Sequence, residues 1–196
     1  MAGDLRIIGG SARGRRLASA PGQEVRPTSS RVREAIFSIL MDRVPGAQVL
    51  DLFAGVGTLG LEALSRGAAA VLFLEQNPRH AAAINSSLET LGFDDRGRVM
   101  RMDVVRFLAR GRAARPAGGF DVVFVDPPYA AGQLETTLPL LATADIIAPG
   151  GVAVVEHGAE LAAKTTAGWE KGRTYRYGKT SVTLLFPDSP DQGDTP

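Results

Sequence analysis

Short apolar runs alternate with amphipathic segments along the chain from residue 45 onward. The apolar runs, rich in Val, Leu and Phe, lie at residues 48–54, 70–75, 98–102, 120–126 and 151–156. Helix-like segments lie between them, at residues 58–66, 78–91, 104–110 and 132–144. Strands that alternate with helices at this spacing form a parallel sheet with right-handed crossovers and helices on both faces. The pattern therefore predicts an α/β fold.

The last part of the pattern departs from this alternation. Residues 173–178 and 180–186 are two strand-like runs separated by little more than a turn. Two strands joined this closely must pair antiparallel. The sheet is therefore predicted to be mostly parallel and to finish with an antiparallel hairpin. The polar, Pro-rich tail at residues 188–196 is predicted to be disordered.

The first 44 residues precede this pattern. RIIGGSARGRRL, which begins at Arg6, predicts a glycine-bearing hairpin or extended arm. Residues 30–40 predict a helix, with Thr28, Ser29 or Ser30 as its N-cap. Its apolar face is predicted to consist of Val32, Ala35, Ile36, Ile39 and Leu40. We therefore divide the chain into an N-terminal arm and helix (1–44), an α/β domain (45–187) and a tail.

Composition excludes several classes of function. The 196 residues are 44% hydrophobic and 22% charged, the balance of a globular domain. The absence of cysteine excludes a disulfide framework and a thiolate metal site, and two histidines do not suffice for a histidine cluster. We expect no bound metal. Since no segment approaches the roughly 20 apolar residues of a membrane span and no signal peptide is evident, a cytoplasmic location is expected. We also expect a monomer.

Charge is unevenly spread, although the net charge is only +1. Residues 1–43 hold eight arginines against four acidic residues, a balance of +4. A second cluster, residues 96–115, holds seven arginines against Asp103. Both clusters could simply be solvated faces. However, the basic residues are all arginine, whose planar fork suits phosphates, and the first cluster is interleaved with glycine. The pattern favours a polyanionic partner.

A glycine motif follows the first predicted strand. Gly55, Gly57 and Gly60 stand between a strand and a helix, and Glu75 follows 20 residues after Gly55. This is the fingerprint of a loop that binds an adenosine-containing cofactor, with the acid on the ribose hydroxyls. NAD and S-adenosylmethionine both fit that pattern. Asp51, beside the loop, would repel the phosphates of NAD but attract the positive methionine end of S-adenosylmethionine. The sequence therefore favours S-adenosylmethionine.

A third acidic residue has two interpretations. Asp103 follows the third predicted strand and could accept a hydrogen bond from the adenine amino group, with Val104 supplying its backbone N–H. Asp103 could equally be an exposed N-cap of the next helix. The sequence leaves both roles open.

The fourth predicted strand ends in Asp126-Pro127-Pro128-Tyr129. Ligands of an open α/β sheet bind beyond the carboxyl ends of its strands. There the Asp126 carboxylate and the Pro127 carbonyl are two acceptors that match an NH2 group, and Tyr129 offers a face on which a base can stack. Two accepted hydrogen bonds would orient the amine, and the carboxylate would stabilise the positive charge that develops on it. The motif therefore predicts transfer of a methyl group to the amine of a nucleobase.

These motifs together resemble a known family. DPPY resembles the signature of S-adenosylmethionine-dependent amino-methyltransferases. RIIGGSARGRRL, RPTSSRVREAIFSIL, DLFAGVGTLGLEALSRGA, FDVVFVDPPY and YGKTSVTLL resemble the RsmD family, the bacterial 16S ribosomal RNA (guanine(966)-N2)-methyltransferases. The likeness runs from about Arg6 to Phe186. It implies a class I, Rossmann-like methyltransferase fold with a seven-stranded sheet. It also implies small-subunit ribosomal RNA as substrate and N2-methylguanine as product.

The resemblance also implies roles for individual residues. Asp126, Pro127, Pro128 and Tyr129 would form the catalytic set around the target guanine. Cofactor-binding residues would be Thr28, Asp51, Phe53, Ala54, Gly55, Gly57, Thr58, Glu75, Gln76, Asp103, Val104 and Asp126. The resemblance places Arg31 and Arg33 near the RNA entrance, and the first basic cluster adds Arg6, Arg13, Arg15 and Arg16 as predicted RNA-binding residues.

Other functions remain open at this point. A nicotinamide-dependent oxidoreductase could use the same glycine loop. The same methyl transfer could act on DNA adenine, on another RNA or on a protein glutamine. A non-catalytic RNA-binding factor of ribosome assembly is a further alternative.

Overall fold

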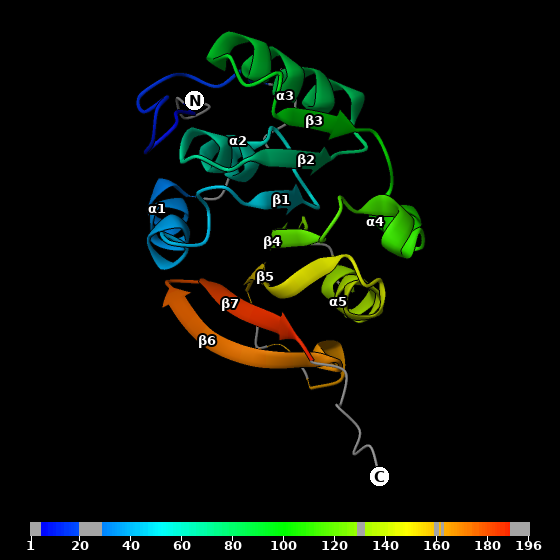
Figure 1. The fold of residues 1–196 in the computed structure, drawn as a ribbon. Coiled ribbons are helices and arrows are strands. Elements are labelled where there is room, and N and C mark those ends of the chain that lie inside the picture. The colour runs from blue at the N-terminus through cyan, green and yellow to red at the C-terminus, as the bar shows by residue number, and fades with distance from the viewer. Residues whose placement is uncertain (1–4, 20–28, 129–131, 159–160, 162, 189–196) are drawn as a thin grey trace.

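The computed structural model describes residues 5–19, 29–128, 132–158, 161 and 163–188. Within this part of the chain seven strands form one sheet in the order β3-β2-β1-β4-β5-β7-β6 (Figure 1). The strands are β1 (Gln48–Asp51), β2 (Ala70–Leu74), β3 (Gly97–Met100), β4 (Phe120–Val125), β5 (Ile147–His157), β6 (Trp169–Tyr177) and β7 (Thr180–Pro187). The helices are α1 (Ser30–Ile39), α2 (Thr58–Ser65), α3 (Pro78–Leu91), α4 (Val104–Leu108), α5 (Gln133–Thr143) and two short 3₁₀ turns, η1 (Gly111–Ala114) and η2 (Ala163–Thr166).

The direction of the strands confirms the predicted fold class. Strands β3, β2, β1, β4 and β5 pair in parallel, and β7 pairs antiparallel with both β5 and β6. The chain builds outward from β1 to β3 and then returns to place β4 on the other side of β1. The strand order therefore reverses between β1 and β4, where an open α/β sheet binds its ligands. This is the Rossmann-like, seven-stranded sheet that the resemblance implied.

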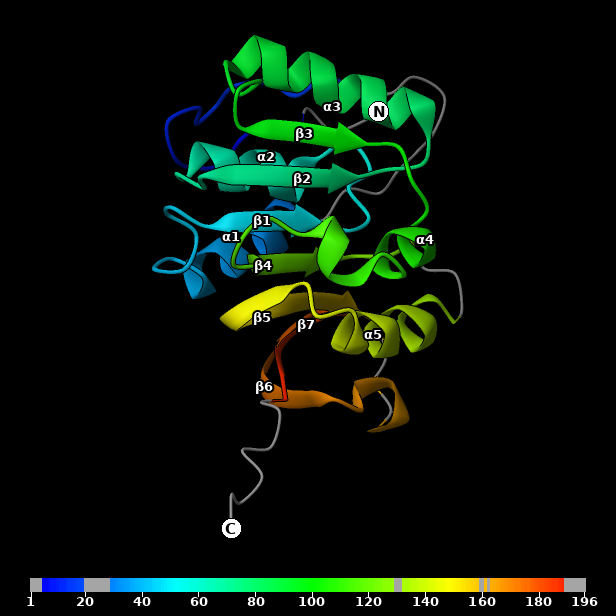
Figure 2. The ribbon, with the colours of Figure 1, turned by 45° about the vertical axis from the view of Figure 1, so that its right-hand side comes forward.

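Helices cover both faces of the sheet, as Figures 1 and 2 show. Alternate strand residues point to opposite sides. Val49 and Phe124 belong to a core shared with α1, α2 and α3, which we call the α2 face. Leu50 and Val125 belong to a core shared with α4 and α5, which we call the α5 face.

The ends of several strands differ from the predicted runs; β6, predicted to begin at residue 173, begins at Trp169. The strand predicted at 48–54 ends at Asp51. Leu52 and Ala54 remain buried beyond that end and donate backbone hydrogen bonds to Phe124 and Leu74, at 3.1 Å each. The apolar run therefore reports burial rather than strand structure. Strand β5 is longer than predicted and contains a register shift opposite Phe120 and Val122.

The predicted N-terminal hairpin is present. Arg6 and Arg16 form an antiparallel bridge, and the amide of Ile7 donates to the carbonyl of Arg15 at 3.0 Å. Ile7 and Leu17 are buried in the core of the α2 face. The hairpin therefore packs on the α/β domain. The division at residue 44 stays a prediction, and the tail beyond Asp188 lies outside the described residues.

Helix α1 begins where the sequence predicted, but its buried face is rotated. Ser29 is the N-cap, and its hydroxyl accepts a hydrogen bond from the amide of Val32. Phe37 and Arg33 are buried, whereas Ala35 and Ile39 are only half-buried. The ring of Phe37 packs on Phe124 of β4, 5.7 Å between centroids. Packing of Phe37 against Phe124 on the α2 face therefore fits the observed orientation of this helix.

Candidate active site

Three glycines shape the loop between β1 and α2, each for a different steric reason. Gly55 and Gly57 have φ angles of 54° and 82°, in the left-handed region that favours glycine. A Cβ atom at Gly57 would also lie 3.0 Å from Ile84 of α3. A Cβ atom at Gly60 would collide with the ring of Phe73 on β2. The glycine motif therefore produces a tight turn and a close approach of α2 to the sheet.

Asp51 lies at the carboxyl end of β1, directly beneath this loop. Its side chain is buried, and Oδ2 accepts a hydrogen bond from the amide of Gly60 at 3.1 Å. The pKa of Asp51 is raised to about 7, chiefly by burial; the Gly60 hydrogen bond lowers it, and the nearby carboxylates of Asp126 and Glu75 raise it. Three carboxyl groups therefore converge here, where a positively charged ligand would be stabilised.

Glu75 follows β2 and supports the glycine loop from the other side. Oε2 accepts from the amide of Gly55 at 2.8 Å, and Oε1 accepts from the amide of Asn77 at 2.7 Å. Nδ1 of His80 lies 3.8 Å from Oε2. A carboxylate has about four lone-pair sites, so both oxygens can still accept hydrogen bonds from ribose hydroxyls. Glu75 thus links the loop to the start of α3.

Asp126 follows the carboxyl end of β4, the strand next to β1. Asp51 pairs in register with Phe124, so Asp126 lies two residues beyond that level on the same face of the sheet. Its charge contributes to the raised pKa of Asp51. Pro127 is half-buried and Pro128 is exposed, while Tyr129 lies outside the described residues. The first three residues of the Asp126-Pro127-Pro128-Tyr129 motif therefore lie at the point where strand order reverses.

The other predicted cofactor residues are distributed around the same loop. Phe53 is half-buried, Ala54 and Thr58 are buried, and Gln76 is exposed beside Glu75. Thr28 lies outside the described residues.

The structure shows one of the two roles considered for Asp103. Its Oδ1 accepts a hydrogen bond from the amide of Arg106 at 3.1 Å, so Asp103 is the N-cap of α4. The carboxylate is exposed and adjoins Val104, the first residue of that helix. A contact with adenine through the second oxygen remains a prediction.

The arginine-rich hairpin lies at the opposite edge of the sheet from Asp51 and Asp126. Its backbone binds the C-terminal end of α2: the amide of Ser11 donates to the carbonyl of Ser65 at 2.7 Å. The guanidinium of Arg15 donates to the carbonyl of Thr90, near the end of α3, at 2.6 Å. Because α3 has 14 residues, Thr90 lies roughly 20 Å from the Glu75 end of that helix. An RNA that contacts both regions must span a comparable distance.

Glu62 fixes this hairpin in place and was not identified from the sequence. Its buried carboxylate accepts from the amides of Ile8 and Gly9, at 2.8 and 2.7 Å, and from Nε of Arg66 at 2.7 Å. The only sequence signal was an acidic residue in the mostly apolar helix TLGLEALS, and acidic residues are common on the exposed faces of helices. Its role depends on a contact with a segment more than fifty residues earlier.

The predicted RNA-binding arginines differ in exposure. Arg6, Arg13, Arg15, Arg16 and Arg31 are exposed. Arg33 is only 2% exposed and lies between α1 and α2, where burial lowers its pKa and Glu62 opposes that shift. Its guanidinium does not reach the surface, so we remove Arg33 from the predicted RNA contacts. The signal for its burial was its position four residues before Phe37, on the same side of the helix.

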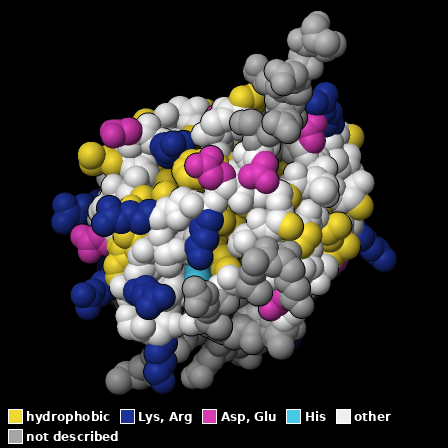
Figure 3. Space-filling model, turned by 90° about the horizontal axis from the view of Figure 1, so that it is seen from below, with side chains coloured by type: hydrophobic (Ala, Val, Ile, Leu, Met, Phe, Trp, Pro, Cys, Tyr) yellow, Lys and Arg dark blue, Asp and Glu magenta, His cyan; other side chains and the backbone are white. Residues whose placement is uncertain are grey.

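Other basic side chains lie nearer the carboxyl edge. Arg101 follows β3 and Arg106 lies in α4, and both are exposed. Lys179 is exposed in the turn that joins β6 and β7. Figure 3 views the molecule from the β6 side and shows Lys and Arg side chains gathered toward one side of that surface. By contrast, Arg112 of the second arginine cluster pairs with Asp145.

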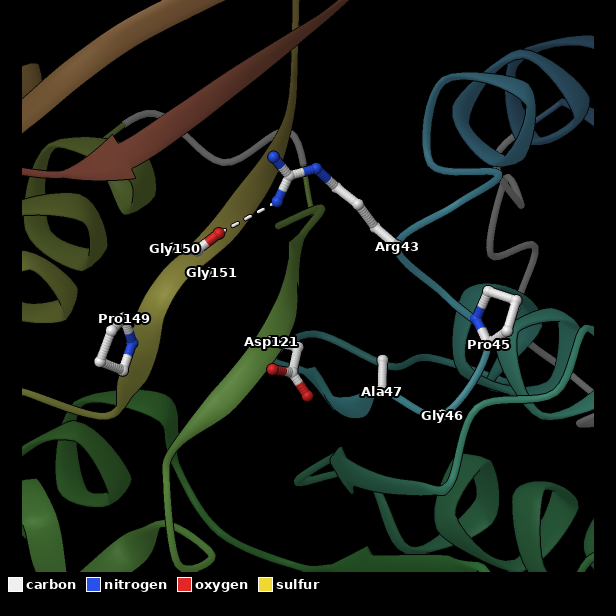
Figure 4. A pocket seen from close by; sticks show the side chains of 8 residues that line it. All are labelled: Arg43, Pro45, Gly46, Ala47, Asp121, Pro149, Gly150 and Gly151. Atoms are coloured by element: carbon white, nitrogen blue, oxygen red, sulfur yellow. Dashed lines mark hydrogen bonds between the residues drawn. The ribbon is translucent and has the colours of Figure 1, made fainter.

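A pocket of about 290 Å³ lies at the amino-terminal edge of the sheet (Figure 4). Its polar groups already have partners: Oδ2 of Asp121 accepts from the amide of Gln48 at 2.7 Å, and Arg43 donates to the carbonyl of Gly150 at 3.0 Å. Since ligands of such sheets bind at the carboxyl edge, this pocket is not the expected cofactor site.

Among the described residues, no group of three or more His, Asp or Glu side chains is arranged to hold a metal ion. Over the same residues, no helix has the length and apolar character needed to span a bilayer.

Comparison with known proteins connects this site to a family. The model of the family Conserved hypothetical protein 95 matches residues 5–186. Ribosomal RNA small subunit methyltransferase D of Escherichia coli K12 is 36% identical over 193 residues, 98% of this chain and 94% of that protein. The solved structure of Escherichia coli yhhF, a protein described as a methyltransferase, has a TM-score of 0.79 at 36% identity and covers 93% of this chain and 97% of its own.

A more distant structure shows the same fold. An RNA methyltransferase from Salinibacter ruber, solved with S-adenosyl-L-homocysteine, has a TM-score of 0.63 at 17% identity and covers 86% of this chain and 99% of its own.

Proposed function

The chain belongs to the Conserved hypothetical protein 95 family, the RsmD family, and on this premise we propose that it methylates the N2 amine of a guanine in small-subunit ribosomal RNA, with S-adenosylmethionine as methyl donor. The observation that carries the proposal is the position of Asp126-Pro127-Pro128. These residues follow β4 where strand order reverses, beside the glycine loop and Asp51. The relatives named for ribosomal RNA methylation support the choice of substrate.

The residues present fit S-adenosylmethionine. Asp51 is buried among other carboxylates and would interact favourably with a positive ligand, whereas the phosphates of NAD would be repelled. Gly55 and Gly57 would let the cofactor approach the loop backbone, and Glu75 would accept hydrogen bonds from the ribose. When bound, S-adenosylmethionine supplies an electrophilic methyl group on a positively charged sulfur.

Asp126 would act on the substrate amine. Its carboxylate and the carbonyl of Pro127 would accept the two N–H hydrogen bonds of the guanine amine, which holds the nitrogen in line with the methyl group. The carboxylate would also stabilise the positive charge that develops on that nitrogen. An ordinary carboxylate is too weak a base to deprotonate the neutral amine beforehand. Asp126 would instead accept a proton after the amine has become cationic.

The function can be tested by measuring methyl transfer and cofactor binding in the same variants. Asp126→Ala should lower transfer to small-subunit RNA by at least about 100-fold, because the developing charge loses its partner. Calorimetry should show that its affinity for S-adenosylmethionine stays within about threefold of wild type, a change below 1 kcal/mol. Asp42→Ala, an exposed change of the same kind, serves as control. Parallel loss of binding and transfer would move Asp126 to the cofactor side. Wild-type transfer to DNA or protein alone would contradict the proposed substrate.

A further inference from the structure

Glu156 lies next to Asp126 at the carboxyl end of the neighbouring strand. Val125 of β4 pairs with Val155 of β5, so the following residues, Asp126 and Glu156, are adjacent across the two strands. Val125 and Val155 lie on the α5 face. Because successive side chains of a strand point to opposite faces, Asp126 and Glu156 point to the α2 face. The pairing of Glu156 with Val182, which is buried in the core of the α2 face, places it on the same side.

The carboxylate is mostly enclosed at this position. Glu156 is 9% exposed. The strands β1, β4 and β5 are neighbours in the sheet, and their carboxyl ends carry Asp51, Asp126 and Glu156, respectively. Neighbouring parallel strands are about 4.8 Å apart. Side chains that start from adjacent strands can each bring one carboxylate oxygen to one of two hydrogen-bond donors on neighbouring atoms of a planar ligand.

The Watson–Crick edge of guanine presents such a pair. Its N2 amine and its N1–H are both donors and are bonded to the same ring carbon. Adenine and cytosine carry an acceptor nitrogen at the position beside their amine. A second carboxylate next to Asp126 would therefore accept from N1–H of guanine and repel the ring nitrogen of the other two bases.

We propose that Glu156 accepts a hydrogen bond from N1–H of the target guanine and thereby determines the base specificity of the site. This inference rests on the proposed function, since it assumes that Asp126 holds the N2 amine. Sites built to bind a specific polar group of the substrate reject analogues that lack it strongly, because the buried group then has no partner.

The test uses RNA in which 2-aminopurine replaces the target guanine. This base keeps the 2-amino group, but its N1 is an acceptor without hydrogen. Wild-type protein should prefer guanine by at least about 100-fold in kcat/KM. Glu156→Gln should reduce this preference by about tenfold or more, because an amide N–H can donate to N1 of 2-aminopurine. Glu156→Ala should lose transfer to guanine without gaining transfer to 2-aminopurine.

Glu170→Gln, an exposed change on β6, should keep the wild-type preference. Calorimetry with S-adenosylmethionine should show unchanged cofactor affinity in Glu156→Gln. An equal guanine preference in wild type and Glu156→Gln would overturn the inference while leaving the proposed function intact. Equal use of both bases by the wild type would also overturn it, without reliance on any variant. Absence of transfer to guanine by the wild type would overturn the proposed function and this inference together.

Discussion

At the scale of single residues, Asp51 provides a titratable group at the expected position of the cofactor. Its pKa is raised from 3.8 to about 7, chiefly by burial. The group is therefore protonated in the folded protein below pH 7, but ionised above about pH 4 in the unfolded chain. The unfolded state binds fewer protons across this window, so Asp51 makes the folded protein less stable as pH rises from about 4 to about 7.

Cofactor binding should show the opposite trend with pH. A positive ligand favours ionised Asp51, so affinity for S-adenosylmethionine should fall as pH drops below 7, approaching about tenfold per pH unit. Asp51→Asn should bind more weakly at pH 8 and should lose this component of the pH dependence. Calorimetric titrations of both proteins between pH 5.5 and 8.5 separate the contribution of Asp51 from that of the ionisation of the ligand itself. Identical profiles for the two proteins would mean that Asp51 does not face the cofactor.

Residue identity predicted the acidic positions better than the basic ones. Glu75 and Asp126 end predicted strands, Asp51 lies near the end of another, and the carboxyl ends of parallel strands share one edge. The resemblance implied that Arg33 contacts RNA, yet the rotation of α1 that packs Phe37 on Phe124 buries this side chain. That rotation depends on contacts with β4, more than eighty residues later, which helical periodicity does not report.

At the scale of elements, Gly60 sets the distance between α2 and β2. A side chain at this position would enter the space of the Phe73 ring. Gly60→Ala should therefore lower the free energy of unfolding by about 1–3 kcal/mol, although alanine is the better helix former. Urea denaturation measures the change.

A double-mutant cycle isolates this steric cause. In a Phe73→Leu background, which removes the ring, Gly60→Ala should be less destabilising than in wild type. Equal destabilisation in both backgrounds would show that the ring is not the constraint.

Most element boundaries followed from the apolar pattern, because helix and strand periods differ clearly. Helix α3 matches its predicted range of 78–91, and the antiparallel hairpin is confirmed. The end of β1 and the start of β5 were missed, since buried turns and bulges have the same apolar composition as the strands they adjoin. The Glu62 contact with the arm was also missed, because it joins two segments that carry no shared motif.

At the scale of the whole molecule, the structure separates two basic regions. The arginine hairpin lies against the C-terminal ends of α2 and α3, whereas Arg101 and Arg106 lie near the carboxyl edge. A target base must leave its stack to reach Asp126, so a guanine in a loop or bulge should be a better substrate than one in a duplex. Flanking RNA would then extend toward the hairpin.

Replacing Arg13, Arg15 and Arg16 by alanine should weaken RNA binding and flatten its salt dependence. The log–log slope should change by up to about 0.9 per lost duplex contact, or about 0.7 for single-stranded RNA. A matched triple change at Lys171, Arg173 and Arg176 removes the same charge from β6 and should leave the slope closer to wild type. Cofactor affinity should be unchanged in both. Normal methylation by the hairpin variant at every salt concentration would make the hairpin a solvated face.

The central claim is transfer of a methyl group to N2 of guanine in small-subunit RNA through Asp126. Its most direct test is nucleoside mass spectrometry of ribosomal RNA from cells with and without the gene. Deletion should remove one N2-methylguanosine from small-subunit RNA and none from large-subunit RNA. The wild-type gene should restore that nucleoside, and the Asp126→Ala gene should not. Unchanged N2-methylguanosine in the deletion strain, or full restoration by Asp126→Ala, would contradict the claim.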